Sequence, residues 1–264
     1  MLSEIWKHLP QNIKNYTYYE PFAGAGAVFL KLQPEKAVIN DSNEQLINAF
    51  CVIKDNVEEL ILLLKDHVKN NDKDYFYKIR NLDREPPVFN KLTNTEKAAR
   101  FIYLNKTCYN GLYRVNSKGF FNVPCGKYQN PSVYGEDVLY QINNYFNLNN
   151  IRFLCCDFEK AVSDTDENSF IYFDPPYHTD KKNFTSYQAD GFDEKDQERL
   201  CGLIIKLTGK GIKCLLSSSD TGFIRELYNM KIFKIYPIQA KRMINSKASG
   251  RGLINEIIIK NWKD

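Results

Sequence analysis

The residues best suited to chemistry form a tetrapeptide directly after an apolar run. Ser169–Phe173 reads Ser-Phe-Ile-Tyr-Phe, and Asp174, Pro175, Pro176 and Tyr177 follow at once. Consecutive apolar and aromatic residues predict a buried central strand, and two prolines cannot continue its hydrogen-bonded ladder. The sequence therefore predicts a carboxylate, a stiff turn and an aromatic ring at the end of a strand, where open α/β sheets bind ligands.

A second segment combines a strand, a glycine-containing turn and a helix. Thr17–Tyr19 is a short strand candidate, and the turn that follows carries Gly24 and Gly26 before the helical run Val28–Leu32. Glycines let the backbone turn tightly and let a ligand approach it closely. By itself this pattern could also be an ordinary turn.

Asp41 adds weight to the ligand interpretation, because it follows a second predicted strand, Ala37–Ile39. An acidic residue at that point is the expected partner of ribose hydroxyls, so the pair of motifs favours a nucleotide-like ligand. The alternative is that Asp41 caps the next helix, although Ser42 or Asn43 could do so instead.

Hydrophobic periodicity predicts the elements that position these motifs. Helices are expected at residues 3–9, 44–70 with a break at Asp55 or Asn56, 73–81, 95–105, 133–147, 193–209 and 221–228. Further strands are expected at 151–155, 170–173, 212–216, 232–238 and 253–259, the last two as an edge hairpin. Pro86–Pro87 is expected to be a loop, and Asp180–Asp190 a mobile lid.

The alternation of strands and helices is interrupted once, since no strand pattern occurs between residue 44 and about residue 110. We therefore expect an α/β fold with a Rossmann-like sheet, formed by residues 1–55 and 148–264. Residues 56–147 would be an inserted, mostly helical domain that carries a β-hairpin.

The predicted hairpin lies where two short aromatic and β-branched runs flank Asn116–Gly119, which is rich in turn residues. The charged residues here are Arg114, Lys118 and then Lys127, all of them basic. Arginine can bind guanine with two hydrogen bonds, and an aromatic ring can wedge or stack where a base leaves a duplex. The hairpin is therefore a candidate DNA-reading element, with an ordinary capping hairpin as the alternative.

Basic residues are concentrated in two windows without acids, residues 97–135 and 227–255. The formal net charge is +4, and each window holds six basic residues, so the remainder of the chain is net −8 (4 − 12). The basic residues are Lys97, Arg100, Lys106, Arg114, Lys118 and Lys127, then Lys231, Lys234, Lys241, Arg242, Lys247 and Arg251. This pattern favours a polyanionic partner over a merely solvated face.

Composition excludes several classes of protein. Apolar residues make up 43% of the 264 residues and charged residues 26%, as in soluble globular proteins. No apolar run is long enough to span a membrane, and the N-terminus lacks the form of a signal peptide. The seven cysteines are odd in number and irregularly spaced, and the three histidines lie far apart, so we expect neither a disulfide framework nor a metal site. A cytoplasmic protein is the simplest interpretation.

In their order along the chain, these motifs resemble the Dam group of DNA adenine-N6 methyltransferases. The matching segments are Glu20–Gly26, Asn40–Asn43, Asn110–Arg114 with Phe121–Pro124, Asp157–Phe158 and Asp174–Tyr177. The resemblance covers nearly the whole chain and implies the α-class, in which the donor motif comes first and a target-recognition domain is inserted. It implies a site-specific, adenine-specific DNA methyltransferase that uses S-adenosylmethionine on double-stranded DNA at GATC sites, as a monomer or weak dimer. Whether it serves restriction–modification, serves housekeeping or is phage-borne stays open.

The resemblance also assigns roles to residues. The donor would contact Glu20, Phe22, Gly24, Gly26, Asp41 through its ribose, Asp157 and Phe158 through its adenine, and Asp174. The catalytic pocket would consist of Asp174, Pro175, Pro176 and Tyr177. DNA would contact Tyr109, Asn110, Leu112, Arg114, Asn116, Lys118, Asn122, Pro124, Lys127 and Tyr128, with Tyr109 entering the duplex and Leu112, Arg114 and Pro124 reading the sequence.

The chain departs from the family pattern at its start. The family normally has a Trp-x-Gly-Gly-Lys-like segment before a helix that resembles Leu2–Leu9, and the sequence begins at that helix. The resemblance therefore implies that a segment which contacts the donor and the target base is missing.

The tetrapeptide suits the chemistry that the resemblance implies. The N6 amine of adenine is a poor nucleophile, because its lone pair is delocalised into the ring. Asp174 can accept one N–H and the carbonyl of Pro175 the other, while Pro176 stiffens the turn and Tyr177 stacks on a flipped base. The methyl group comes from the donor, so no covalent enzyme intermediate is needed and the cysteines are not nucleophiles.

Two rival hypotheses remain open. One keeps the fold but acts on RNA or on a protein glutamine, since similar corners occur in such enzymes. The other is a catalytically impaired methyltransferase fold that binds DNA. Methyl incorporation into different substrates would decide the first, and the affinity for S-adenosylmethionine the second.

Overall fold

The structure is a computed structural model that describes residues 2–128, 131–179, 191–241 and 253–263. The chain divides into two compact units, the first comprising Met1–Ser42, Asn150–Thr185 and Phe192–Asp264 and the second Asn43–Asn149 with Ser186–Gly191. The boundary expected at residue 56 thus falls inside the second unit, after its first helix. Which unit holds the donor and which the DNA stays a prediction.

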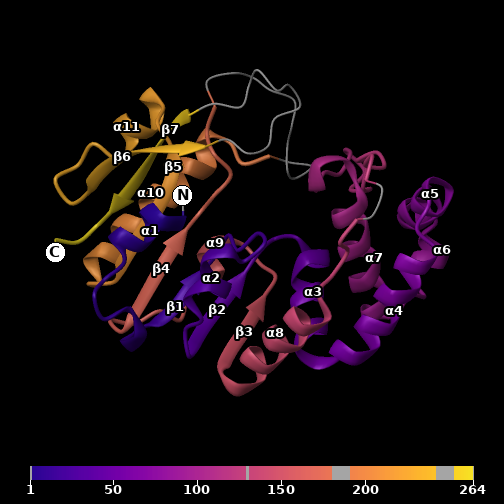
Figure 1. Ribbon diagram of the computed structural model, residues 1–264. Helices are drawn as coiled ribbons and strands as arrows, with labels where there is room; N and C mark the ends of the chain where they lie inside the picture. The colour runs from indigo at the N-terminus through magenta and orange to yellow at the C-terminus, as the bar shows by residue number, and fades with distance from the viewer. Residues whose placement is uncertain (1, 129–130, 180–190, 242–252, 264) are drawn as a thin grey trace. The chain divides into compact units, whose positions relative to one another are not determined.

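The first unit is built on a sheet whose strands lie in the order β3-β2-β1-β4-β5-β7-β6 (Figure 1). The strands are β1 (Thr17–Glu20), β2 (Lys36–Asn40), β3 (Asn150–Leu154), β4 (Ser169–Phe173), β5 (Lys213–Ser219), β6 (Lys234–Lys241) and β7 (Leu253–Lys260). Strands β1 to β5 pair in parallel, and β7 pairs antiparallel with both β5 and β6. The expected Rossmann-like sheet is confirmed, and so is its closing edge hairpin.

The order of the strands reverses between β1 and β4. From β1 the sheet continues to β2 and β3, whereas from β4 it continues to β5. This is the topological switch point of a doubly wound fold, where loops that follow the strands diverge and leave room for a ligand. The two motifs singled out in the sequence follow the two strands on either side of this point.

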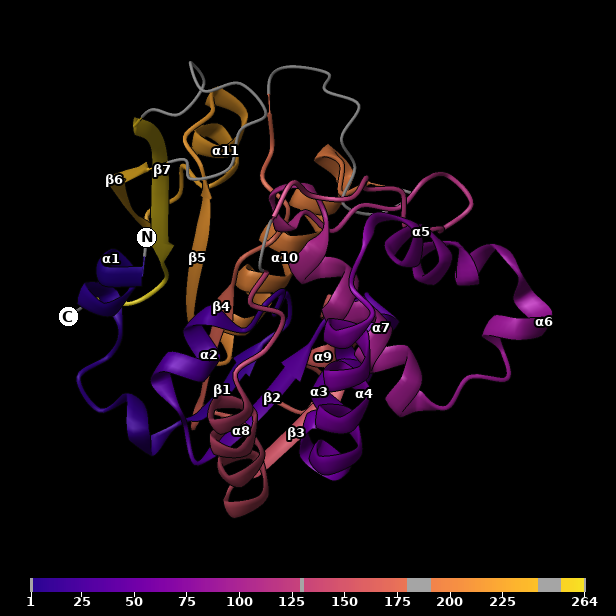
Figure 2. The same cartoon turned by 45° about the vertical axis from the view of Figure 1, so that its right-hand side comes forward.

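Helices of the first unit are α1 (Leu2–His8), α2 (Ala27–Leu32), α9 (Phe158–Ala161), α10 (Glu194–Gly209) and α11 (Gly222–Leu227), with the 3-10 turn η1 (Ile13–Asn15). The longest, α10, lies alongside β5 (Figure 2). It buries Leu200, Ile204 and Leu207 against Ile171 and Phe173 of β4 in one apolar core. The helix expected at residues 193–209 is confirmed, and its buried face fixes α10 against the strand that carries the tetrapeptide.

The second unit is mostly helical, as expected. It contains α3 (Glu44–Asp55), α4 (Val57–Lys69), α5 (Lys73–Asn81), α6 (Pro86–Phe89), α7 (Asn94–Thr107) and α8 (Glu136–Leu148), with 3-10 turns η2 (Leu82–Arg84) and η3 (Tyr109–Gly111). The break between α3 and α4 falls at Asn56, as predicted. The loop expected at Pro86–Pro87 is wrong, because both prolines form the first turn of α6, where a missing N–H costs no hydrogen bond.

The predicted hairpin is present as a chain reversal without continuous strands. Two isolated antiparallel bridges, Val115↔Phe121 and Cys108↔Cys125, mark its two arms. The Asn116 side chain holds the tip by accepting hydrogen bonds from the backbone of Lys118 and Phe120, both at 3.0 Å. Backbone hydrogen bonds also join the arms, from the N–H of Asn116 to the carbonyl of Phe120 at 2.9 Å and from the N–H of Asn122 to the carbonyl of Arg114 at 3.0 Å. Because two strands alone are marginally stable, side chains and this short backbone pairing together hold the hairpin.

No helix in the part of the chain that the structure describes is long and apolar enough to cross a membrane.

Candidate active site

The turn after β1 is held in shape by Asp41. The backbone N–H of Gly24 donates a hydrogen bond of 2.9 Å to Oδ2 of Asp41. Gly24 has a φ of 49° and Gly26 a φ of 68°, left-handed values that favour glycine. A Cβ built on Gly24 would meet no atom within 4 Å, so the space beside this turn is open. The turn therefore combines an anchored backbone with room for a ligand.

The alternative role for Asp41, as a helix cap, is wrong. Oδ1 of Asn43 caps α3 by accepting hydrogen bonds from the backbone of Gln45 at 3.1 Å and Leu46 at 3.3 Å. Asp41 instead lies at the end of β2 and faces the glycine turn.

Asn40 is a structural clamp that the sequence analysis missed. The side chain is 1% exposed. Its Nδ2 donates to the carbonyls of Pro21 at 2.9 Å and Cys156 at 3.0 Å, and its Oδ1 accepts from the backbone N–H of Cys156 at 3.0 Å. Asn40 thus ties the loops after β1 and β3 to the end of β2. The available signal was a polar residue at the end of a buried strand.

Aromatic rings gather beside the glycine turn. The Phe22 ring lies 5.3 Å from that of Phe158 and 5.5 Å from that of Phe192, measured between centroids. Asp157 caps α9 by accepting a 2.9 Å hydrogen bond from the backbone of Glu159, and its carboxylate pairs with Arg199 at 3.1 Å. The fold therefore brings Phe22 against Phe158, the neighbour of Asp157, although the two rings lie far apart in the sequence.

Asp174 follows the last residue of β4. Its side chain is exposed to solvent, but the protein atoms around it hinder its hydration, and this desolvation raises the pKa of the carboxyl to about 6. Hydrogen bonds from the Tyr177 and Tyr172 hydroxyls act in the opposite direction and lower that pKa. Asp174 is therefore ionised at neutral pH and can accept hydrogen bonds from a ligand.

Buried hydroxyl groups lie beneath Asp174. Tyr172 is fully buried, and its hydroxyl lies 2.9 Å from Oγ of Ser217 on β5. The Tyr172 hydroxyl also hydrogen-bonds Asp174. A hydroxyl has one proton to donate, so Tyr172 donates to the Asp174 carboxylate when Ser217 is the donor in the bond between Ser217 and Tyr172. The sequence analysis treated Tyr172 as part of an apolar strand and missed this role.

Glu20, the last residue of β1, is a buried acid close enough to Asp174 to feel its charge. It is 2% exposed, and its Oε2 accepts a 2.7 Å hydrogen bond from the Tyr18 hydroxyl. Burial, together with the negative charge of Asp174, raises the pKa of Glu20 to about 8, although the Tyr18 hydrogen bond lowers it. Glu20 therefore carries a proton at neutral pH, so Asp174 and Glu20 are not both negatively charged.

The segment after Asp174 is fixed by side chains from other elements. Nε2 of Gln197 on α10 donates to the carbonyl of Pro176 at 3.0 Å, and Oγ of Ser219 donates to the carbonyl of His178 at 2.7 Å. The ring of His178 contacts Oγ1 of Thr221 through Nδ1 at 3.1 Å. The expected lid, Asp180–Asp190, lies outside the described residues.

The residues predicted to contact DNA lie together on the hairpin of the second unit. Six are exposed and four are half-buried: Tyr109, Arg114, Lys118, Pro124, Lys127 and Tyr128, then Asn110, Leu112, Asn116 and Asn122. Arg114 donates from Nε to Oδ1 of Asn122 at 2.7 Å, which orients its guanidinium. Asn110 has a left-handed φ of 56°, so the turn before Leu112 is sharply defined.

A buried ion-pair cluster anchors this hairpin. Oδ2 of Asp83 accepts from the backbone of Phe121 at 2.8 Å and pairs with Arg100 at 2.9 Å. Arg84 donates to the carbonyl of Phe121 at 2.8 Å. Arg100 is 2% exposed, so its assignment to a polyanion-binding window is wrong: desolvation and the Asp83 partner make it structural. Arg242, Lys247 and Arg251 lie outside the described residues.

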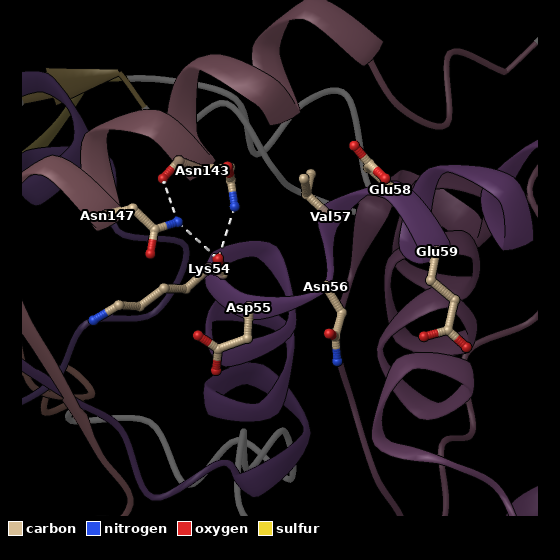
Figure 3. A pocket seen from close by; sticks show the side chains of 8 residues that line it. All are labelled: Lys54, Asp55, Asn56, Val57, Glu58, Glu59, Asn143 and Asn147. Atoms are coloured by element: carbon tan, nitrogen blue, oxygen red, sulfur yellow. Dashed lines mark hydrogen bonds between the residues drawn. The ribbon is translucent and has the colours of Figure 1, made fainter.

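A polar pocket at the junction of α3 and α4 contains none of the predicted site residues (Figure 3). Asn143 and Asn147 of α8 donate from Nδ2 to the carbonyl of Lys54 at 2.7 Å and 2.8 Å. These bonds satisfy the carboxyl end of α3, so this part of the pocket wall has a structural role. Within the described part of the chain, no three His, Cys, Asp or Glu residues are grouped as a metal site.

Comparison with known proteins decides the family. A family model described as D12 class N6 adenine-specific DNA methyltransferase matches residues 1–244. The chain belongs to this family.

Several relatives of this methyltransferase align along almost its whole length. It is 42% identical to a type II methyltransferase, M1.LlaDCHI, of Lactococcus lactis subsp. cremoris, over 99% of this chain and 91% of the relative. It is 40% identical to the type II methyltransferase M.MjaIII of Methanocaldococcus jannaschii, over 99% and 95%. It is 38% identical to a DNA adenine methylase of Haemophilus influenzae, over 98% and 88%.

Proposed function

We propose that this methyltransferase transfers a methyl group from S-adenosylmethionine to N6 of adenine in duplex DNA at GATC sites, by direct transfer to a flipped-out base. The observation that carries the proposal is the position of Asp174–Tyr177 directly after β4, across the switch point from the glycine turn after β1. Membership of an adenine-specific family supports the reaction.

The residues around the glycine turn fit the donor. Glu20, Phe22, Gly24, Gly26 and Asp41 would hold its amino acid and ribose, and the open space beside Gly24 gives the backbone access to it. Asp157 and Phe158 would hold its adenine, with Asp174 at the reacting end. When bound, S-adenosylmethionine supplies a methyl group on a sulfonium sulfur.

The tetrapeptide would activate the amine by accepting its hydrogen bonds. Asp174 is ionised above about pH 6, so at neutral pH its carboxylate can accept one N–H of the target amine. The Pro175 carbonyl can accept the other, which favours a pyramidal nitrogen whose lone pair points at the methyl group. Burial and the charge of Asp174 raise the pKa of Tyr177, so its phenol stays neutral while its ring stacks on the base.

The second unit would recognise the DNA. Its hairpin exposes Tyr109, Arg114 and Lys118, which suit insertion, base reading and phosphate contact. The similarity to proteins named DNA adenine methylase supports adenine in DNA as the target. Specificity for GATC is supported by the resemblance of the segment Asn110–Pro124 to the Dam group.

The decisive experiment compares methyl acceptors. Purified protein is given labelled S-adenosylmethionine with a GATC duplex, the same duplex with the site scrambled, an RNA hairpin and a glutamine-containing peptide. Label in the N6-methyladenine of the GATC duplex alone is the expected result. Equal labelling of the scrambled duplex would contradict GATC specificity, and labelling of RNA or peptide instead would overturn the proposed substrate.

A digest of DNA from expressing cells tests the same proposal in vivo. A nuclease that cuts only methylated GATC should cut this DNA and should leave DNA from cells with an Asp174→Ala variant intact. Asp174→Ala should keep its affinity for the donor, measured by calorimetry, because most donor contacts lie on other loops.

A further inference from the structure

The sheet does not fix the turn that carries Asp174. The last pairs that β4 makes are Phe173↔Leu216 with β5 and Ile171↔Tyr19 with β1. Asp174–Tyr177 lies beyond them, and its two prolines have no N–H with which to hydrogen-bond. The orientation of the carbonyl groups in this turn must therefore be set by partners outside the sheet.

Gln197 of α10 provides such a partner. It is 1% exposed, and its Nε2 donates to the carbonyl oxygen of Pro176 at 3.0 Å. A carbonyl can only accept, so the amide must present its nitrogen to Pro176, which settles the orientation of the group. Oε1 of Gln197 is buried and has no hydrogen-bond partner among the described residues.

That orphaned oxygen argues against simple space filling. A buried polar atom without a partner destabilises a fold, so an apolar side chain of similar size would serve a purely packing role better. The sole hydrogen bond that the Gln197 amide makes among the described residues is the one to Pro176. We therefore attribute the amide at this position to its hydrogen bond with the Pro176 carbonyl.

The helix that carries Gln197 is rigidly placed. A capping box closes its first turn, with the backbone of Asp196 donating to Asp193 at 3.1 Å and the backbone of Asp193 donating to Asp196 at 3.3 Å. Leu200 and Ile204, on the following turns, are buried in the core. Figure 1 shows α10 beside the β4–β5 part of the sheet. Because the capping box and the core hold α10 in place, Gln197 can hold the carbonyl of Pro176 in a fixed position.

We propose that Gln197 is a positioning residue for methyl transfer. The ladder fixes the chain up to Phe173, and Gln197 fixes it again at the carbonyl of Pro176. Asp174 and Pro175 lie between these two points, so the directions of the carboxylate and of the Pro175 carbonyl are set. Gln197 does not touch the substrate; it acts through the backbone. This inference rests on the proposed role of Asp174–Tyr177 in methyl transfer.

Gln197→Met is the first test, because methionine keeps the length and volume of the side chain and removes the donor. We expect kcat on the GATC duplex to fall at least tenfold while the Kd for S-adenosylmethionine, measured by calorimetry, changes less than twofold. A kcat within twofold of the original, in protein shown by circular dichroism to be folded, would overturn the inference.

Gln197→Glu adds a readout that a merely structural role would not move. An ionised carboxylate repels the Pro176 carbonyl, whereas a protonated one donates to it as the amide does. Burial raises the pKa of such a carboxyl. The ratio of its kcat to that of the unaltered protein should therefore rise as the pH is lowered from 9 to 6. A ratio that stays constant across this range counts against positioning by hydrogen bond. This variant also decides the question if the methionine variant does not fold.

Asn143→Leu is the matched control. Asn143 also places a half-buried amide on backbone carbonyls, those of Ile53 at 2.8 Å and Lys54 at 2.7 Å, but it belongs to the other compact unit (Figure 3). We expect a lower melting temperature with kcat of the folded protein unchanged.

The activity of the unaltered protein is measured first, because it separates the two hypotheses. If the unaltered protein methylates no adenine, the proposed function fails. If the unaltered protein and Gln197→Met are both fully active, the positioning role alone is refuted.

Discussion

At the scale of single residues, the site depends on which carboxylates are charged. Asp174 and Glu20 end neighbouring strands, and desolvation raises both pKa values, to about 6 and about 8. At neutral pH Asp174 is therefore an acceptor, while Glu20 is protonated. The two acids differ because the charge of Asp174 adds to the effect of burial on the pKa of Glu20, whereas hydrogen bonds from the Tyr177 and Tyr172 hydroxyls favour the ionised form of Asp174.

The charge of Asp174 predicts the pH dependence of the reaction. Its pKa lies above the ordinary value of 3.8, and the ionised form is the active one, so kcat should rise with pH through about 6 and level off above it. Asp174→Asn replaces one acceptor oxygen by a donor and should lower kcat roughly 100-fold or more. Single-turnover rates between pH 5 and 8 measure both effects. An unchanged rate at pH 5 would show that the carboxylate is not needed in its charged form.

Tyr172→Phe tests the hydroxyl beneath Asp174. The hydroxyl lowers the pKa of Asp174 by donating to its carboxylate, so its removal should shift the rise in kcat to higher pH. We expect a loss of roughly threefold to tenfold in kcat at pH 7, in keeping with the net contribution of one hydrogen bond, about 0.5–1.5 kcal/mol. Ser217→Ala removes the hydroxyl that is hydrogen-bonded to Tyr172, and it should shift the pH dependence of kcat less. Identical profiles for Tyr172→Phe and the unaltered protein would refute the link.

Glu20→Gln tests the proton on the buried acid through stability. The folded pKa of about 8 exceeds the ordinary value of 4.5, so folding favours the protonated form and the free energy of unfolding falls as pH rises between these values. Glutamine stays neutral and can still accept from Tyr18. Its advantage over glutamate should therefore grow from pH 5 to pH 8.5, by up to roughly 4 kcal/mol. Urea unfolding at the two pH values measures it, and a constant difference would mean that Glu20 ionises normally.

At the scale of elements, the base of the hairpin depends on Gly126, whose backbone passes close to the end of α7. The backbone of Gly126 donates to the carbonyl of Thr107 at 2.8 Å. A Cβ on Gly126 would lie 2.8 Å from that carbonyl oxygen and 2.4 Å from the ring of Tyr128. The ring could move, but the carbonyl belongs to the backbone at the end of α7.

Gly126→Ala should therefore distort the hairpin base, and we expect at least tenfold weaker binding to a GATC duplex with an unchanged Kd for S-adenosylmethionine. Ser117→Ala, at the exposed tip, is the control and should bind DNA normally. Fluorescence anisotropy with a labelled duplex measures the effect. Tight binding by Gly126→Ala would show that the hairpin base is not needed for recognition.

At the scale of the whole molecule, two compact units divide the proposed tasks. The glycine turn and the tetrapeptide belong to the first unit, which contains the sheet, and the exposed hairpin belongs to the second, mostly helical unit. Changes in one unit should then leave the other task intact.

Arg114→Ala tests that division. Its guanidinium is exposed and oriented by Asn122, so loss of a base contact should cost about 1–3 kcal/mol of DNA affinity and relax one position of the site. The affinity for the donor should not change. Binding to duplexes with single substitutions in GATC gives the measurement. An equal loss on every duplex would mean that Arg114 contacts phosphate alone.

The sequence by itself determined the order of the elements and the position of the chemical motifs. The buried strand before Asp174, the helix α10 and the break at Asn56 could be predicted because they depend on local properties: the period of apolar residues, the two prolines and a helix-breaking asparagine. The same local signals misassigned Pro86–Pro87, since proline both breaks a helix and begins one.

The tertiary structure alone decided which side chains meet. Asp41 faces the glycine turn, Arg100 is buried against Asp83, and Gln197 holds the carbonyl of Pro176. Each of these contacts joins residues that are distant in the chain, and a polar residue in a sequence carries no mark of the partner that burial will give it. Local pattern thus placed the residues that would do the chemistry, whereas packing decided their charges and the groups that hold them in position.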